Sequence, residues 1–238
     1  MKLYLFAGVK TSPNFMERFR AAMHQKLAEE GHTVHSRLLY PYGDWSRNVL
    51  VQVREIYHDM RLGFSRMHKS IGGARAMREI NEERREGSFV KQPHEPLVLI
   101  GHSGGGTAAV HTAFALREEG ESPIYVIQIG SPKSRIPTDL AGETLYLYGV
   151  GKIRGKMKLD PITRLGTFGG WRAAGQQSWL RWRRDRNGPG HSDSIGILGG
   201  HADYFRESEA YVNEAGRSNL ELTMEKVWDW LQAKIARS

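Results

Sequence analysis

The stretch Leu97-Val-Leu-Ile-Gly-His-Ser-Gly-Gly-Gly106 joins an unbroken apolar run to a segment with helical character. A continuous run of this kind is typical of a strand that is covered on both faces. Glycines two positions before and two positions after Ser103 would let the strand and the following helix pass close together. The stretch therefore predicts a sharp strand-to-helix turn with Ser103 at the N-terminus of the helix, where backbone N–H groups and the helix dipole favour an anion.

Strands and helices are also predicted on both sides of this turn. Periodicity and apolar runs predict strands at residues 2–6, 33–39, 97–100, 124–129 and 144–148, and helices at 13–30, 107–119 and 220–236. The long arginine-rich segment 48–86 predicts two or more helices, broken near Gly63 and near Gly72-Gly73. Strands that alternate with helices predict an α/β fold, and we expect one domain over residues 1–238. Its central sheet should be mostly parallel, with about five to six strands and helices on both faces.

Composition narrows the class of protein and of chemistry. The chain has 238 residues, of which 39% are hydrophobic and 25% charged, as expected for a globular protein. It has no cysteine, which excludes disulfides, thiolate metal ligands and a cysteine nucleophile, and which fits a reducing compartment. The short apolar run at the N-terminus is interpreted as a strand rather than a signal peptide, and no stretch reaches the roughly 18 apolar residues of a membrane span. We therefore expect a cytoplasmic protein.

Basic residues are in excess, with a formal net charge of +8 that favours anionic partners. Part of the excess is local, in a segment that also holds tryptophans: Trp171, Arg172, Trp179, Arg181, Trp182, Arg183, Arg184 and Arg186. Such a segment is most often a solvated loop with a few rings on the core. Contact with anionic lipid, at most transient, or with substrate is the second interpretation, and nucleic acid is the least favoured of the three.

Ser103 is the candidate nucleophile. The alternative is that the glycine-rich turn binds phosphate. It lacks the Gly-x-Gly-x-x-Gly spacing of a dinucleotide site and the Gly-Lys-Ser/Thr ending of a P-loop, so the nucleophile hypothesis is favoured. One donor of an oxyanion hole would be the backbone N–H of Gly104. The second should come from a loop after an earlier strand, and Val9 in Phe6-Ala-Gly-Val9 is the candidate.

A serine nucleophile needs a histidine base and a carboxylate that orients it, in the chain order Ser, acid, His. His201 is the preferred base and His191 the alternative. His102 directly precedes Ser103 in the sequence. It is interpreted as a packing residue whose side chain points away from the serine hydroxyl. For the acid, Asp160 is preferred and Asp139 is the alternative. Asp193 and Asp203 are both close to the candidate histidines in sequence, which disfavours them.

Together these segments resemble the α/β-hydrolase superfamily, and in particular the class 3 (fungal-type) triacylglycerol lipases. The resemblance is carried by four motifs: Phe6-Ala-Gly-Val9, Gly101-His-Ser-Gly-Gly105, Asp160-Pro-Ile-Thr-Arg-Leu165 and Gly200-His-Ala-Asp-Tyr-Phe205. The Asp160 motif, similar to the segment around the family's catalytic acid, is the most discriminating. Val9 departs from the pattern, because the family has a hydroxyl residue there. The chain also starts at the strand that bears this loop, so a compact sheet is expected.

The resemblance implies a serine hydrolase that cleaves carboxylic esters of a small molecule or a lipid, without metal or organic cofactor. A thioesterase or an acyltransferase would use the same residues, and a non-catalytic binding protein for anionic partners is the alternative from another class. Residues 48–96 and 166–190 should overhang the site as a lid or an acyl pocket. A loose apolar stripe within the first of them is interpreted as core rather than lipid-binding surface: Leu62, Phe64, Met67, Ile71 and Met77. Oligomeric state is not predicted.

Overall fold

The computed structural model describes residues 1–87, 95–153, 156–173 and 180–236. Its strands are β1 (Lys2–Phe6), β2 (His35–Leu39), β3 (Leu97–His102), β4 (Ile124–Ile129), β5 (Thr144–Ile153), β6 (Lys156–Leu159), β7 (Gly170–Ala173), β8 (Leu180–Arg183) and β9 (His191–Leu198). The helices are α1 (Glu17–Glu29), α2 (Val49–Met60), α3 (Ile71–Arg85), α4 (Gly104–Glu118), α5 (Thr138–Ala141) and α6 (Asn219–Ile235), with 3-10 turns η1 (Phe64–Lys69), η2 (Ile162–Arg164) and η3 (Glu209–Tyr211).

A mostly parallel sheet forms the centre of the molecule. Its strands follow the order β2-β1-β3-β4-β5-β6, and β9 pairs with β5 on the side away from β4. All neighbours run parallel except β5 and β6, which are antiparallel. The mixed α/β class and the mostly parallel sheet are thus as predicted from the sequence. The sheet has seven strands in the described part of the chain, rather than five or six.

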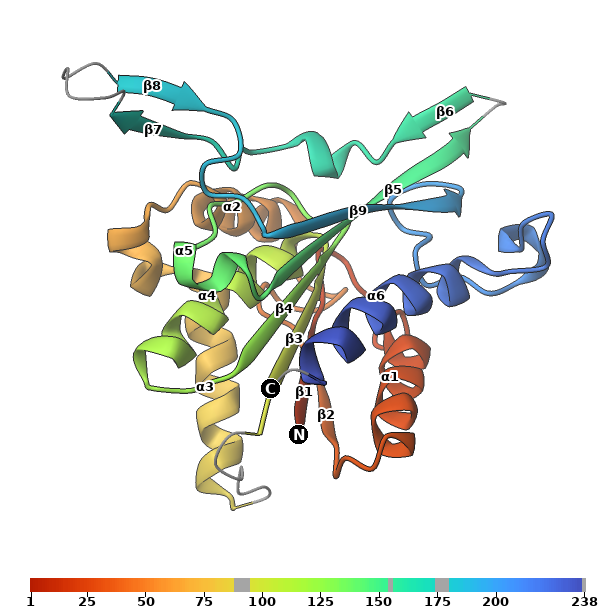
Figure 1. Cartoon of the computed structure of the whole chain (residues 1–238), viewed down its shortest axis with the longest axis horizontal. Coiled ribbons are helices and arrows are strands. Elements are labelled where there is room, and N and C mark those ends of the chain that lie inside the picture. Colours follow the sequence, from red (N-terminus) through yellow and green to blue (C-terminus); the bar gives the residue numbers. More distant parts are fainter. Residues whose placement is uncertain (88–94, 154–155, 174–179, 237–238) are drawn as a thin grey trace.

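Helices cover both faces of the sheet, α1 and α6 on one and α3 and α4 on the other (Figure 1). Neighbouring residues of a strand point to opposite faces, so each central strand contributes to two cores. In β3, Val98 and Ile100 pack with α1 and α6, whereas Leu97 and Leu99 pack with α3 and α4. This double burial explains the unbroken apolar run in the sequence.

Two sequence-based expectations need correction. The sequence analysis misses strands β6 and β9 of the sheet. In β9 the first three residues are exposed and polar and only the second half is apolar. The second predicted break in 48–86 is also misplaced, since Gly72 and Gly73 lie inside the first turn of α3. The helix begins after Ser70, whose side chain accepts a hydrogen bond from the N–H of Gly73 as an N-cap. The break near Gly63, between α2 and η1, is confirmed.

The predicted lid segments contribute ordinary elements to this architecture. Segment 48–96 forms α2, η1 and α3, and segment 166–190 contains the separate two-stranded ribbon of β7 and β8. Residues 88–94 and 174–179 of these segments, Trp179 among them, lie outside the described residues. Among the helices that the structure describes, none has the length and apolar character required to cross a bilayer.

Candidate active site

Ser103 occupies the turn between β3 and α4, at the carboxyl end of a central strand. Its φ is 54° and its ψ is −133°, a strained conformation for a residue with a side chain. A Cβ atom on Gly101 would overlap the backbone of Gly105. A Cβ atom on Gly105 would overlap the carbonyl group of Phe6 in β1. The two glycines therefore let strand and helix approach as the sequence predicts, and the strained turn holds the Ser103 side chain outward.

The Ser103 hydroxyl is the first member of a chain of hydrogen bonds. His201 Nε2 lies 2.9 Å from Ser103 Oγ, and His201 Nδ1 lies 2.8 Å from Asp160 Oδ2. Because a carboxylate can only accept, Nδ1 carries the proton, which leaves Nε2 free to accept from the serine hydroxyl. The structure therefore brings together the three residues that the sequence predicts as nucleophile, base and acid, from segments 98 and 41 residues apart from His201.

Asp160 is held in place by three donors. Besides His201, the Tyr204 hydroxyl donates to Oδ2 at 2.8 Å, and the N–H of Ile162 donates to Oδ1 at 2.9 Å. Burial alone would raise the pKa of Asp160, but the hydrogen bonds from His201, Tyr204 and Ile162 outweigh it and lower that pKa below its ordinary value. Asp160 is thus a fixed anion beside the imidazole.

Tyr204 is a site residue that the sequence analysis did not identify. Its hydroxyl accepts a hydrogen bond from the N–H of Gly149 at 2.6 Å while it donates to Asp160. Burial and the negative charge of Asp160 raise the pKa of Tyr204 far above the ordinary value, so it stays a donor. Its position three residues after His201, within the quoted motif, is the signal that could have indicated this role.

His102 packs against the base from the neighbouring strand end. Its ring stacks on that of His201 with centroids 5.0 Å apart, and its Nε2 donates to the His201 carbonyl oxygen at 3.2 Å. Burial, together with the positive charge of a protonated His201, lowers the pKa of His102 to about 3. His102 is therefore neutral at pH 7. It packs as the sequence predicts, and it also fixes the backbone of His201.

The loop after β1 passes directly over the serine. A Cβ atom on Gly8 would lie 2.7 Å from Ser103 Cβ, so only glycine allows this approach. The next residue, Val9, lines the same pocket as Ser103 and Gly104. The loop is pinned by Gln52 of α2, a fully buried side chain that accepts from the N–H of Lys10 at 3.1 Å. Sequence analysis did not single out Gln52, because its role depends on the placement of α2.

The alternative acid and base residues lie elsewhere. His191 begins β9 opposite Leu145, at the amino end of the sheet, whereas Ser103 follows the carboxyl end of β3. Asp139 is 60% exposed on α5. Asp193 forms an exposed ion pair with Lys226, and Asp203 accepts from the N–H of Gly200 in a local turn. None of these four contacts Ser103 through a hydrogen bond in the described structure.

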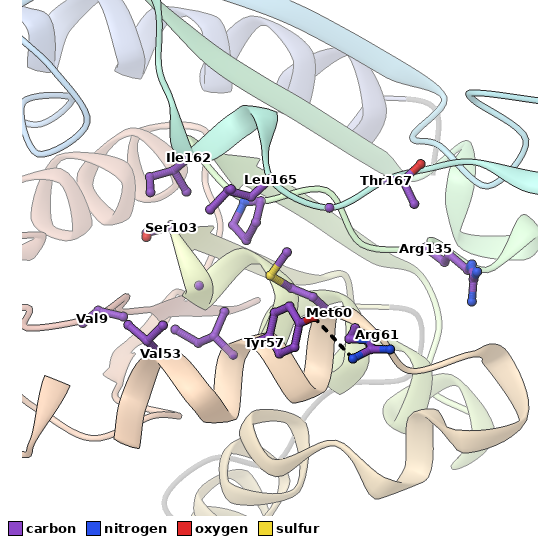
Figure 2. A pocket seen from close by; sticks show the side chains of 14 residues that line it. Val9, Val53, Tyr57, Met60, Arg61, Ser103, Arg135, Ile162, Leu165 and Thr167 are labelled. Atoms are coloured by element: carbon purple, nitrogen blue, oxygen red, sulfur yellow. Dashed lines mark hydrogen bonds between the residues drawn. The ribbon is translucent and has the colours of Figure 1, made fainter. Parts of the chain in front are cut away.

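A pocket of about 630 Å³ opens beside Ser103 (Figure 2). Helix α2 supplies one wall through a stripe at positions i, i+3, i+4 and i+7: Val53, Ile56, Tyr57 and Met60. The segment after Asp160 supplies the other wall through Ile162 and Leu165. The stripe quoted from the sequence instead belongs largely to the core, since Leu62, Met67 and Met77 are buried. The residues of that sequence stripe lie after α2, on η1 and in α3, whereas the pocket wall is formed by α2 itself.

Strands β7 and β8 form a ribbon apart from the central sheet (Figure 1). Trp171 pairs with Trp182, and Arg172 pairs with Arg181. Cross-strand partners share a face and neighbours alternate, so the tryptophans and Leu180 lie on one face and the arginines on the other. Trp171 is 56% exposed and Leu180 65% exposed. The segment is therefore an exposed ribbon with one aromatic and one basic face, rather than a loop folded onto the core.

No protein-family model matches this chain, and no curated protein is detectably similar to it. Within residues 1–87, 95–153, 156–173 and 180–236, no three His, Asp or Glu side chains are placed to hold a metal ion.

Proposed function

We propose that this protein is a serine hydrolase that cleaves carboxylic esters through an acyl-enzyme on Ser103, on an α/β-hydrolase fold. The observation that carries the proposal is the continuous hydrogen-bond chain from Ser103 Oγ through His201 to Asp160, at the edge of a pocket. A histidine that can take the proton of a serine while a carboxylate orients it is the arrangement that makes serine nucleophilic.

The reaction follows from the positions of these groups. Ser103 Oγ attacks the ester carbonyl carbon while His201 Nε2 takes the hydroxyl proton, and Asp160 stabilises the resulting imidazolium. His201 then gives this proton to the leaving alcohol as the carbon–oxygen bond of the ester breaks. Water, deprotonated by the same nitrogen, attacks the acyl-enzyme, and the proton returns to Ser103 as the carboxylic acid leaves.

The negative charge that develops on the carbonyl oxygen has to be stabilised by hydrogen-bond donors. The N–H of Gly104, at the start of α4, and the N–H of Val9 are the proposed pair. Both residues line the pocket beside Ser103. Gln52 supports this arrangement, because its hydrogen bond to Lys10 fixes the residue next to Val9. Gln52 acts as a positioning residue rather than a catalytic one.

The experiment is hydrolysis of p-nitrophenyl esters of graded acyl length, with matched acyl thioesters in parallel. The wild-type protein should release p-nitrophenol from short and medium esters, and Ser103→Ala should reduce this to the rate of buffer. Faster turnover of the thioesters, or transfer of the acyl group to an added alcohol, would favour the thioesterase or acyltransferase alternative. No turnover of any substrate by folded protein would favour a binding protein.

We also propose that the ribbon of β7 and β8 contacts anionic lipid. The separation of tryptophans from arginines onto opposite faces supports this, since aromatic rings enter the interfacial region while arginines meet anionic headgroups. Wild-type protein should co-sediment with vesicles of phosphatidylcholine and phosphatidylserine. The double variant Trp171→Ser/Trp182→Ser should not, whereas Trp45→Ser, at a tryptophan 55% exposed outside the ribbon, should behave as wild type. Equal sedimentation of all three proteins would contradict the proposal. So would ribbon-dependent binding to single-stranded DNA in place of vesicles.

A further inference from the structure

The pocket beside Ser103 contains two arginines at the end away from the serine. Arg61 follows the last turn of α2, and Arg135 comes from the loop between β4 and α5. Figure 2 shows both beyond the apolar middle of the pocket, which Tyr57, Met60 and Leu165 form. Of the described residues that line the pocket, these two are the charged ones. The cavity therefore has an apolar part next to the reacting atom and a cationic far end.

Arg135 reaches the segment that follows Arg61, although the two arginines come from different elements. Arg135 Nη1 lies 3.8 Å from the position that a Cβ atom of Gly63 would occupy, two residues beyond Arg61. Arg61 is oriented by Tyr57, whose ring centroid is 5.3 Å from the guanidinium carbon and whose hydroxyl accepts from Nη1 at 3.3 Å. Neither arginine forms an ion pair with a carboxylate in the part of the chain that the structure describes.

A second pair of arginines, which bind a carboxylate of α2, shows the contrast. Arg47 and Arg75 both bind Glu55 of α2, each through two hydrogen bonds of 2.6 to 3.0 Å. There the protein supplies the anion between two converging guanidinium groups, and the pKa of Glu55 falls to about 2 because these hydrogen bonds outweigh its burial. At Arg61 and Arg135 the described residues supply no such carboxylate, and both arginines line the pocket.

We infer that the substrate carries an anionic group, a carboxylate or a phosphate, at the end remote from the ester. Planar guanidinium groups bind both oxyanions through paired hydrogen bonds. The spacing fits a chain of several methylene groups. Ile56 packs over Gly104 next to the proposed nucleophile, and Arg61 is five residues further along the chain, at the C-cap of α2, about 7.5 Å at 1.5 Å per residue. This inference rests on the proposed function, because it describes the substrate of the same site.

The test compares three esters of equal chain length. These are monomethyl octanedioate, with a free carboxylate, its phosphate-terminated analogue, and the neutral dimethyl octanedioate. The wild-type protein should hydrolyse at least one of the anionic esters with about tenfold or higher kcat/KM than the neutral ester, mainly through a lower KM. Which anion is preferred distinguishes a carboxylate substrate from a phosphate substrate.

The variants Arg61→Gln and Arg135→Gln should bring the ratio of anionic to neutral kcat/KM close to one. Arg66→Gln is the matched control, since Arg66 is exposed on η1 and does not line the pocket, and it should keep the wild-type ratio. A wild-type ratio near one, or a ratio that the two pocket variants do not change, would overturn the inference and leave the proposed function standing.

Binding to Ser103→Ala protein separates this inference from the proposed reaction. Calorimetric titration with each anionic ester should give saturable binding of at least one of them, and Ser103→Ala/Arg61→Gln/Arg135→Gln should lose about tenfold or more of that affinity. If wild-type protein cleaves no ester but this binding difference is found, the proposed hydrolase function fails and the anion site stands. Binding that is equal in both proteins would overturn the anion site.

Discussion

Two buried aspartates of this protein organise similar sets of partners with different consequences. Asp160 accepts hydrogen bonds from Tyr204, from a backbone N–H and from His201, which in turn reaches Ser103. Asp59, at the end of α2, accepts from Tyr42, from the backbone N–H groups of Ile71 and Gly72, and from Ser70, which in turn contacts His111. Each cluster holds an Asp, a Tyr, a Ser and a His that contacts this Ser, and at Asp59 a second histidine, His58, has its Nδ1 3.0 Å from Oδ1.

The order of the side chains separates the two clusters. Histidine stands between acid and serine at Asp160, so the serine proton can pass to a base. Serine stands in the middle at Asp59: Ser70 donates its only proton to the carboxylate at 2.8 Å and accepts from Gly73 N–H and from His111. Burial lowers the pKa of His111 to about 4, so this ring is neutral.

Access to solvent also differs. Ser70 is 2% exposed and caps α3, whereas Ser103 lines the open pocket. The proton of Ser70 is directed to Asp59 rather than to His111, and the side chain is buried. The comparison teaches that residue types alone do not make a nucleophile. The central position of the histidine and the strained, outward turn support the proposal that Ser103, and not Ser70, is the nucleophile.

The largest expected effect is the fall in kcat when the cluster at Asp160 is broken. Asp160→Asn should reduce kcat for ester hydrolysis about ten-thousandfold, because an amide no longer holds the imidazole in the tautomer that accepts the serine proton. Circular dichroism should show a folded protein. Asp193→Asn, which removes an exposed carboxylate paired with Lys226, is the matched control and should keep the wild-type rate. A rate for Asp160→Asn within tenfold of wild type would contradict the assignment of the acid.

Breaking the cluster at Asp59 should instead lower the stability of the fold. Asp59→Ala leaves the hydroxyls of Tyr42 and Ser70 and two backbone N–H groups without their acceptor, and the free energy of unfolding should fall by about 3 to 5 kcal/mol. Urea unfolding at pH 7 measures this, with Asp139→Ala as the exposed control. An unchanged urea midpoint would show that Asp59 does not hold α2 and α3 together.

A smaller effect is expected where a hydroxyl supports the acid. Tyr204→Phe should lower kcat about tenfold, because Asp160 loses one donor and Gly149 loses its acceptor. The carboxylate is then more basic, so the acid limb of the kcat/KM profile should move to higher pH. Tyr40→Phe, which loses only an exposed hydrogen bond to Pro13, should leave the profile in place. A drop in kcat without a shift of the acid limb would indicate a packing role for Tyr204.

Low pH should weaken both clusters, and this is the smallest of the expected effects. The pKa values of Asp59 and Asp160 are lowered by hydrogen bonds that outweigh burial, below the roughly 3.9 of an unfolded chain. The stability that they contribute is therefore fully present above about pH 4 and is lost as the pH falls through the folded values. Between pH 5 and pH 3, Asp59→Asn should lose about 1 kcal/mol less stability than wild type in urea titrations. Equal losses would mean that Asp59 does not titrate with unfolding.

Local signals account for what the sequence predicts well. The apolar run of β3, the glycines around Ser103 and the start of α4 are adjacent in the chain, so turn and nucleophile could be predicted together. Asp160 and His201 could be chosen by chain order and motif. Tyr204, Gln52 and Arg61 could not, because their roles come from contacts with segments distant in sequence. The same holds for β9, whose polar half gives no strand signal until β5 lies beside it.

The most direct test of the central claim is covalent labelling with a fluorophosphonate, followed by peptide mapping of the folded wild-type protein. The account predicts one adduct, on the peptide that carries Ser103, and none on the peptide that carries Ser70. Ser103→Ala should remain unlabelled under the same conditions. An adduct elsewhere, an equally labelled Ser103→Ala protein, or no adduct at all on folded wild-type protein would contradict the claim that His201 and Asp160 make Ser103 a nucleophile.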